Sequence, residues 1–195
     1  MANFAVENDI GTLKGFLKEF NDWVFGDEFY PNQKPGMLFV QGNINNPGVR
    51  KESHTIKSGE PIIVHVIGTN FIKKDRDSGD KELDDDNKIG RACQDEEGTD
   101  FCDFVKIKGP GDKDWTDLNE HVVQVRTSPD DFTASANNSD LGKWNPPMPS
   151  GTQRGAWSSK ILVLKVSDPG VYELSSQGHG SNDYRQRADF TITVQ

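Results

Sequence analysis

The closing stretch from Ser159 to Gln195 most constrains the fold of this chain. A run of β-branched and other apolar residues from Ile161 to Val166 is long enough for a buried strand. Asp168-Pro169-Gly170 has the composition of a turn, because proline fixes φ and glycine accepts positive φ. Apolar and polar residues then alternate from Asp189 to Gln195, which predicts a last strand with one face in water.

Between these two strand signals, Ser175 to Arg187 is polar and contains Gly178, Gly180, Asn182 and Asp183. Glycines and side-chain oxygens of this kind are typical of a loop. Loops held between strands often carry binding residues. We therefore expect a loop here, and we expect it to hold the ligand site.

Composition limits the class of protein. The chain has 195 residues, enough for one domain with a hydrophobic core, and a formal net charge of -9. Nucleic acid is therefore not an expected partner, because phosphates need a basic face. No apolar run reaches the length of a membrane span, so we expect no membrane insertion. Met1 to Val6 lacks the features of a secretory signal, yet an extracellular or cell-surface location is favoured over a cytoplasmic one.

The predicted fold is all-β, a sandwich with one N-terminal helix. Glycine (19) and proline (10) are frequent and most strand-like runs are short, which favours this class over a helical or βαβ fold. Asn8 to Phe25 has helical apolar spacing, with Asn8 or Asp9 as a cap and Gly26 at the end. We divide the chain into 1–36, helix and linker, and 37–195, one β-sandwich domain. The helix either packs on its own sandwich or docks on another chain to form a homo-oligomer.

Further strands are expected along the middle of the chain. They are Met37–Gln41, Val49–Ile56, Pro61–Gly68, Phe101–Lys108 and Val122–Arg126. His65, inside one of them, is expected to be a paired residue of the core or of a sheet face rather than a ligand. Ser128 to Thr152 is expected to be a long polar loop. Trp144 and Trp157 are either sugar-stacking platforms or core residues.

The segment from Lys73 to Asp103 differs from the rest of the chain, because it holds twelve acidic and six basic residues. It is either a solvated acidic loop or a calcium site, since calcium prefers carboxylate oxygens. Its spacing does not match that of an EF-hand loop. Cys93 and Cys102 either close a small disulfide loop or remain free thiols. Without a second Cys/His pair they do not form a zinc signature.

Taken in order, the chain from about 45 to 195 resembles the bacterial calcium-dependent galactose-binding lectins of the PA-I type. Asn46-Pro47-Gly48 and Lys57-Ser58-Gly59-Glu60 are similar to the first strand and turn of that family. A cysteine pair before a strand follows. Asp168-Pro169-Gly170-Val171-Tyr172 and the strand from Asp189 to Val194 are similar to the closing pattern of that family.

The resemblance implies a jelly-roll sandwich that binds calcium and, through the ion, a sugar. For calcium it implies Asp168, Val171, Asn182, Asp183 and Phe71, with Val171 and Phe71 acting through their backbone carbonyls. The expected ligand-binding residues are Asp85, Asp86, Asn87, Asn182 and Tyr184. The His-Pro pair of the family has no counterpart, since Asp85, Asp86 and Asn87 stand there instead.

The sequence leaves three functions to compare. The first is a calcium-dependent carbohydrate-binding module with its site in the loop before the last strand. The alternative is a structural or assembly subunit of a filament, capsid or surface layer. An enzyme is not expected, because G-x-S-x-G, H-E-x-x-H and a glycine-rich phosphate loop are all missing from the sequence.

Overall fold

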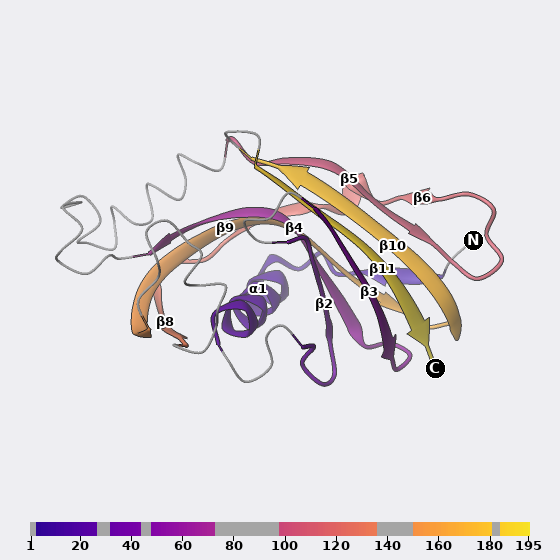
Figure 1. Ribbon diagram of the computed structural model, residues 1–195, viewed down its shortest axis with the longest axis horizontal. Helices are drawn as coiled ribbons and strands as arrows, with labels where there is room; N and C mark the ends of the chain where they lie inside the picture. Colours follow the sequence, from indigo (N-terminus) through magenta and orange to yellow (C-terminus); the bar gives the residue numbers. More distant parts are fainter. Residues whose placement is uncertain (1–2, 27–31, 44–47, 73–97, 136–149, 181–183) are drawn as a thin grey trace.

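The computed structural model describes residues 3–26, 32–43, 48–72, 98–135, 150–180 and 184–195, with only the backbone described at 70–72. These residues form two β-sheets and one α-helix, α1 (Ile10–Phe25), which Figure 1 shows beneath the strands. The predicted all-β sandwich with one helix is therefore confirmed.

The strands fall into two sheets. Sheet A has the order β1 (Phe4–Val6), β9 (Gly151–Val166), β4 (Pro61–Ile72), β2 (Leu38–Gln41), and β7 (Val123–Arg126) and β8 (Asp130–Ala134) also pair with β9. Sheet B has the order β3 (Val49–Ile56), β11 (Arg185–Val194), β10 (Gly170–His179), β5 (Phe101–Lys108), β6 (Thr116–Asp117). Most neighbours are antiparallel, but β2 runs parallel to β4 and β3 runs parallel to β11.

The main core lies between the two sheets. Each strand places alternate residues on this side, because successive side chains of a strand point to opposite faces. Sheet A contributes residues such as Val64 and Leu164, and sheet B contributes Leu174, Phe190 and Ile192, all 2% exposed or less. Tyr172 is also buried here, and its hydroxyl donates a hydrogen bond to the carbonyl of Asp168 at 2.9 Å. This bond fixes the turn between β9 and β10 to the core.

Helix α1 packs on the other face of sheet A and forms a second core. Asp9 caps the helix, because its carboxylate accepts a hydrogen bond from the backbone N–H of Thr12 at 2.8 Å. The buried face of the helix contacts Phe39, Ile63 and Val163 of sheet A. The residues it buries are Leu13, Leu17, Phe20, Trp23, Val24 and Phe25. The apolar face of the helix is thus covered by its own domain and is not free to dock on another chain.

Several strands are longer than predicted. β4 continues to Ile72, β8 lies inside the predicted polar loop from Ser128 to Thr152, and β9 starts already at Gly151. Most of the predicted loop from Ser175 to Arg187 also belongs to β10 and β11. The inward positions there are Ser176, Gly178 and Gln186, which are buried although none of them has an apolar side chain. The apolar alternation that marks a strand is therefore absent from this stretch, which is why its sequence predicted a loop.

Candidate functional site

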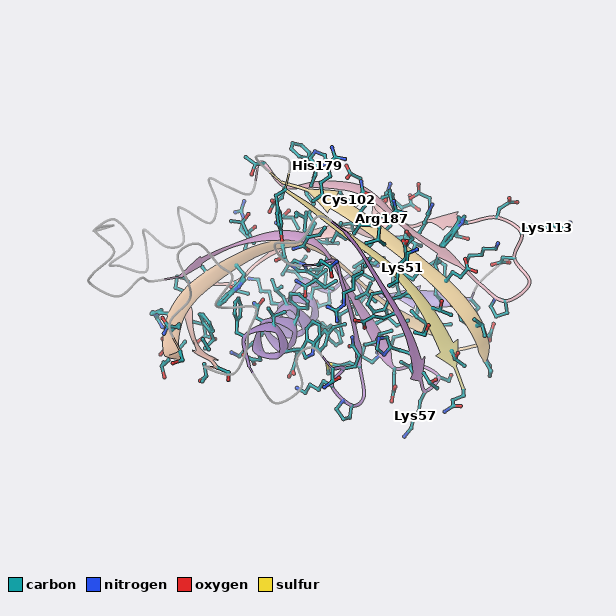
Figure 2. All side chains as sticks on the ribbon, viewed as in Figure 1. Lys51, Lys57, Cys102, Lys113, His179 and Arg187 are labelled. Atoms are coloured by element: carbon teal, nitrogen blue, oxygen red, sulfur yellow. The ribbon has the colours of Figure 1, made fainter. Side chains whose placement is uncertain are left out.

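The outer face of sheet B, on the side away from sheet A, gathers charged, hydroxyl and aromatic side chains. Strand register aligns them in rows. One row crosses all five strands, because Lys51 pairs with Asp189, Asp189 with Ser175, Ser175 with Lys106, and Lys106 with Asp117. The next row is Val49, Arg187, Gln177 and Phe104. Figure 2 shows Lys51 and Arg187 over the same part of this sheet.

A shallow cleft of about 440 Å³ lies over these rows. Strands β3, β5, β10 and β11 form its floor, and Trp115, just before β6, forms part of its wall. The Trp115 side chain is large and apolar, yet the residue is 39% exposed. The polar side chains that line the cleft are Lys51, Glu52, Ser53, Lys106, Glu173, Ser175, Arg187, Asp189 and Thr191.

Asp189 lies at the centre of the cleft in a fixed position. The hydroxyl of Ser175, a buried residue, donates a hydrogen bond to Oδ1 of Asp189 at 2.6 Å. Nη2 of Arg187 lies 3.6 Å from Oδ2 of the same carboxylate. A carboxylate held in this way keeps lone pairs that can accept hydrogen bonds from a ligand.

Two aromatic rings on this face, those of Phe104 and Trp115, are contacted by cations. Nζ of Lys106 lies 5.0 Å from the ring centre of Phe104 and 4.7 Å from that of Trp115. The guanidinium carbon of Arg187 lies 5.7 Å from the ring centre of Phe104. These are cation–π distances, so the cations are held against the rings. The cleft therefore combines flat apolar surface with donors and acceptors.

A His–Asp pair lies at one end of the same face. Nδ1 of His179 is 2.6 Å from Oδ1 of Asp103, and Nε2 of Gln177 donates to the other oxygen at 2.9 Å. The imidazole also stacks on Phe101, with ring centres 5.0 Å apart. Cys102 lies next to Asp103, but burial raises the pKa of its thiol to about 11. A thiol that stays protonated at neutral pH is not an activated nucleophile.

Of the predicted calcium ligands, the structure describes Asp168, Val171 and Phe71, and it does not bring Phe71 together with the other two. Asp168 and Val171 lie at the start of β10, at the end of the hairpin where Gly170 pairs with Val194. Tyr184, which was predicted to contact the sugar, comes just before β11 at the other end of the hairpin, where His179 pairs with Arg185. A strand of ten residues separates the two ends, roughly 30 Å at about 3.3 Å per residue. Phe71 belongs to β4 of sheet A, where its backbone pairs with Ala156.

The remaining predicted residues lie outside the described part of the chain. They are Asp85, Asp86, Asn87, Cys93, Trp144, Asn182 and Asp183. Cys102 is a free thiol in the structure, but Cys93 is not described, so the disulfide alternative stays a prediction. Among the described residues, no group of three or more His, Cys, Asp or Glu is placed to hold a metal ion. In the same residues, no helix has the length and apolar character needed to cross a membrane.

His65 and Trp157 are core residues. His65 is 6% exposed and Trp157 is 5% exposed, and both contribute to the packing between α1 and sheet A. The residues that the sequence did not single out are those of the cleft, above all Lys51, Lys106 and Arg187. Their only sequence signal is their position as outward residues of alternating strands, and this does not show which of them are neighbours.

No known protein family and no curated protein matches the chain. Among solved structures, a chain in the complex of PbICP-C with falcipain-2 is similar over 82% of this chain and 98% of its own length. The identity is 13% and the TM-score is 0.30. The solution structure of amebosin is similar over 76% of this chain and 100% of its own, with 8% identity and a TM-score of 0.27. Similarity at this level carries no argument about function.

Proposed function

We propose that this chain binds carbohydrate through the cleft on the outer face of sheet B. The observation that carries the proposal is the exposed indole of Trp115 beside the fixed carboxylate of Asp189 in one cleft. A sugar ring has apolar C–H faces and a rim of hydroxyl groups. An aromatic ring suits the faces, and a few placed polar groups suit the rim.

The cleft offers both kinds of hydrogen-bonding partner to sugar hydroxyls. Asp189 and Glu173 can accept, and Lys51 and Arg187 can donate. Hydrogen bonds that involve a charged group are shorter and stronger than those between neutral groups. This is the combination needed to hold a neutral diol in one orientation.

The strands also support the proposal by holding the site rigid. β10 and β11 are inner strands of sheet B, with a paired strand on each side. Asp189 is fixed by the buried Ser175, and Lys106 lies against two rings. Side chains that are already ordered lose less entropy when a ligand binds.

The proposal keeps the ligand class expected from the sequence but moves the site. It lies on the outward residues of β10 and β11, not in the loop between them. It does not require calcium, because the residues that line the cleft include none of the predicted calcium ligands. Titrations in calcium and in chelator test this point directly.

We expect Trp115→Ala to weaken saccharide binding by about 30-fold. Removing an aromatic residue that anchors a ligand costs about 2 kcal/mol, and each 1.4 kcal/mol is tenfold in affinity. The measurement is isothermal titration calorimetry with the oligosaccharide that binds best in a panel of neutral and acidic oligosaccharides. Trp115→Phe should keep most of the affinity, because it keeps an aromatic face.

Val171→Ala is the matched control. Val171 is also an exposed apolar residue on the outer face of sheet B, at 54% exposed, but it lies outside the cleft. Truncating its side chain should therefore leave saccharide binding unchanged. The proposal fails if the parent protein binds no oligosaccharide of the panel, with calcium or with chelator. It also fails if Trp115→Ala binds as tightly as the parent.

A further inference from the structure

We infer that the saccharide bound by this cleft is anionic and carries carboxylate or sulfate groups on more than one sugar unit. This inference rests on the proposed function and adds the chemical class of the ligand. Three cations line the cleft, Lys51, Lys106 and Arg187, in a chain whose formal net charge is -9. Their surroundings leave positive charge available to a ligand.

Among the described residues, neither Lys51 nor Lys106 forms an ion pair, although Asp189 lies opposite Lys51 and Asp117 opposite Lys106 in the strand register. Within the ranges that the structure describes, the ammonium of Lys51 forms no hydrogen bond or ion pair. The ammonium of Lys106 lies over the rings of Phe104 and Trp115. A ring face attracts a cation without cancelling its charge, so Lys106 can still attract an anion.

Arg187 is only loosely paired. Its Nη2 lies 3.6 Å from Oδ2 of Asp189, which is longer than a hydrogen bond. Its guanidinium therefore keeps donors for a ligand. Arginine presents these donors in a planar fork that matches the two oxygens of a carboxylate or a sulfate.

The nearby carboxylates do not offset all three cations. Glu52 takes part in other ion pairs, with Nε of Arg50 at 2.6 Å and Nε2 of His54 at 2.6 Å. Asp189 accepts the hydroxyl hydrogen of Ser175 and lies between Lys51 and Arg187. Glu173 lies one row further along β10, opposite Lys108 and Thr191. Because Glu52 is paired with Arg50 and His54, the three cations of the cleft face two carboxylates, those of Asp189 and Glu173. Asp117, outside the cleft lining, accepts a hydrogen bond from the backbone N–H of Asn119.

The register sets the spacing of the cations. Lys51, Asp189, Ser175 and Lys106 occupy one row on four adjacent strands. Strands lie about 4.8 Å apart, so the Cα atoms of the two lysines are separated by roughly 14 Å. The positive charge is therefore spread across the width of four strands rather than gathered at one point. Arg187 lies in the next row, so the cations mark a path along which separate acidic groups of an oligomer can bind.

The test compares the parent protein with charge variants on matched ligands. An oligogalacturonate carries carboxylates, a sulfated galactan oligosaccharide carries sulfates, and a neutral galactan oligosaccharide carries neither. We expect the parent to bind one acidic oligosaccharide at least tenfold more tightly than the neutral one. Lys51→Gln and Arg187→Gln should each weaken that binding by about tenfold and weaken neutral-sugar binding much less, because glutamine keeps a hydrogen-bond donor but loses the charge.

Lys57→Gln and Lys113→Gln are matched controls. Both lysines lie away from the cleft, as Figure 2 shows, and removing them changes the net charge by the same amount. We expect them to keep full affinity. Raising the salt concentration should weaken acidic-sugar binding by the parent more than binding by Lys51→Gln. The parent makes one more ion contact with the ligand, and salt screens that contact.

Four outcomes separate the possibilities. Equal binding of neutral and acidic oligosaccharides overturns this inference but not the proposed function. Acidic-sugar binding that Lys51→Gln and Arg187→Gln leave intact also overturns it. If the parent binds poly-glutamate as tightly as the acidic oligosaccharide, charge alone is recognised and both proposals are overturned. A parent that binds no saccharide also overturns both. Far-UV circular dichroism of each variant shows that it keeps the parent's fold.

Discussion

Leu17→Asp should unfold the domain or bring it close to unfolding. Leu17 has no exposed surface, and it packs between α1 and sheet A. Truncating a buried leucine alone costs about 2 to 5 kcal/mol, and a buried carboxylate without a partner adds to this. We expect a loss of at least about 4 kcal/mol, and domains of ordinary stability have only about 5 to 15 kcal/mol in total.

Urea unfolding of the two proteins measures this loss. Ile10→Asp is the matched control, because Ile10 lies in the first turn of the same helix and is 46% exposed. An acidic residue near a helix N-terminus is favourable, so the control should stay within about 0.5 kcal/mol of the parent. An unchanged Leu17→Asp melt, together with a smaller oligomer in size-exclusion chromatography, would show that the helix serves assembly instead.

The protonation of His65 should by itself lower the unfolding free energy by about 3 kcal/mol as the pH drops from 6.5 to 4. The ring is 6% exposed and stacks on Phe20, with ring centres 4.4 Å apart. Its Nε2 contacts the hydroxyl of Ser159 at 3.2 Å, whereas Nδ1 has no hydrogen-bond partner among the residues that the structure describes. Burial lowers the pKa of His65 from 6.5 to about 4, and Gln186 only partly offsets this effect.

The direction follows from which state binds the proton. Between pH 6.5 and 4 the histidine of the unfolded chain is protonated while the folded one is neutral, so acid favours unfolding. The stability is complete above pH 6.5 and is lost as the pH falls to 4. Each pKa unit corresponds to about 1.4 kcal/mol, which gives the expected 3 kcal/mol.

Urea unfolding at several pH values, for the parent and for His65→Gln, isolates this contribution. Carboxylates titrate in both proteins, so the difference between the two curves reports on His65. The unfolding free energy of the variant should fall less steeply between pH 6.5 and 4. The difference between the two slopes should correspond to the uptake of nearly one proton on unfolding. Parallel curves would show that His65 takes up its proton without unfolding.

Much of the fold could be predicted because the signals are local. The helix was expected over Asn8 to Phe25 and runs from Ile10 to Phe25, with the cap at Asp9. β3 and β5 have the predicted bounds, because turn residues flank them. β10 and β11 were shortened in the prediction, because Ser176, Gly178 and Gln186 occupy inward positions. Gly178 is required there: an added Cβ would lie 2.9 Å from the Cβ of Ile67 in sheet A.

The candidate site could not be predicted in the same way. Lys51 and Asp189 are neighbours only because β3 pairs in parallel with β11, a strand far away in the sequence. Lys106 joins them through the pairing of β5 with β10. No local pattern sets these registers, since they depend on how the inward faces of the strands fit the core. The sequence therefore shows which residues face water, but not which of them share a cleft.

The alternation along β10 and β11 divides the hairpin into two independent sets of positions. Even-numbered residues such as Tyr172, Leu174 and Phe190 are buried against sheet A, whereas odd-numbered residues such as Glu173 and Arg187 face water. Exposed substitutions usually change stability by no more than about 0.5 kcal/mol. The exposed odd positions, which do not include the buried Ser175, can therefore be randomised in a library while the even positions stay constant. One scaffold could in this way acquire new ligand preferences, in evolution or in the laboratory, without being refolded each time.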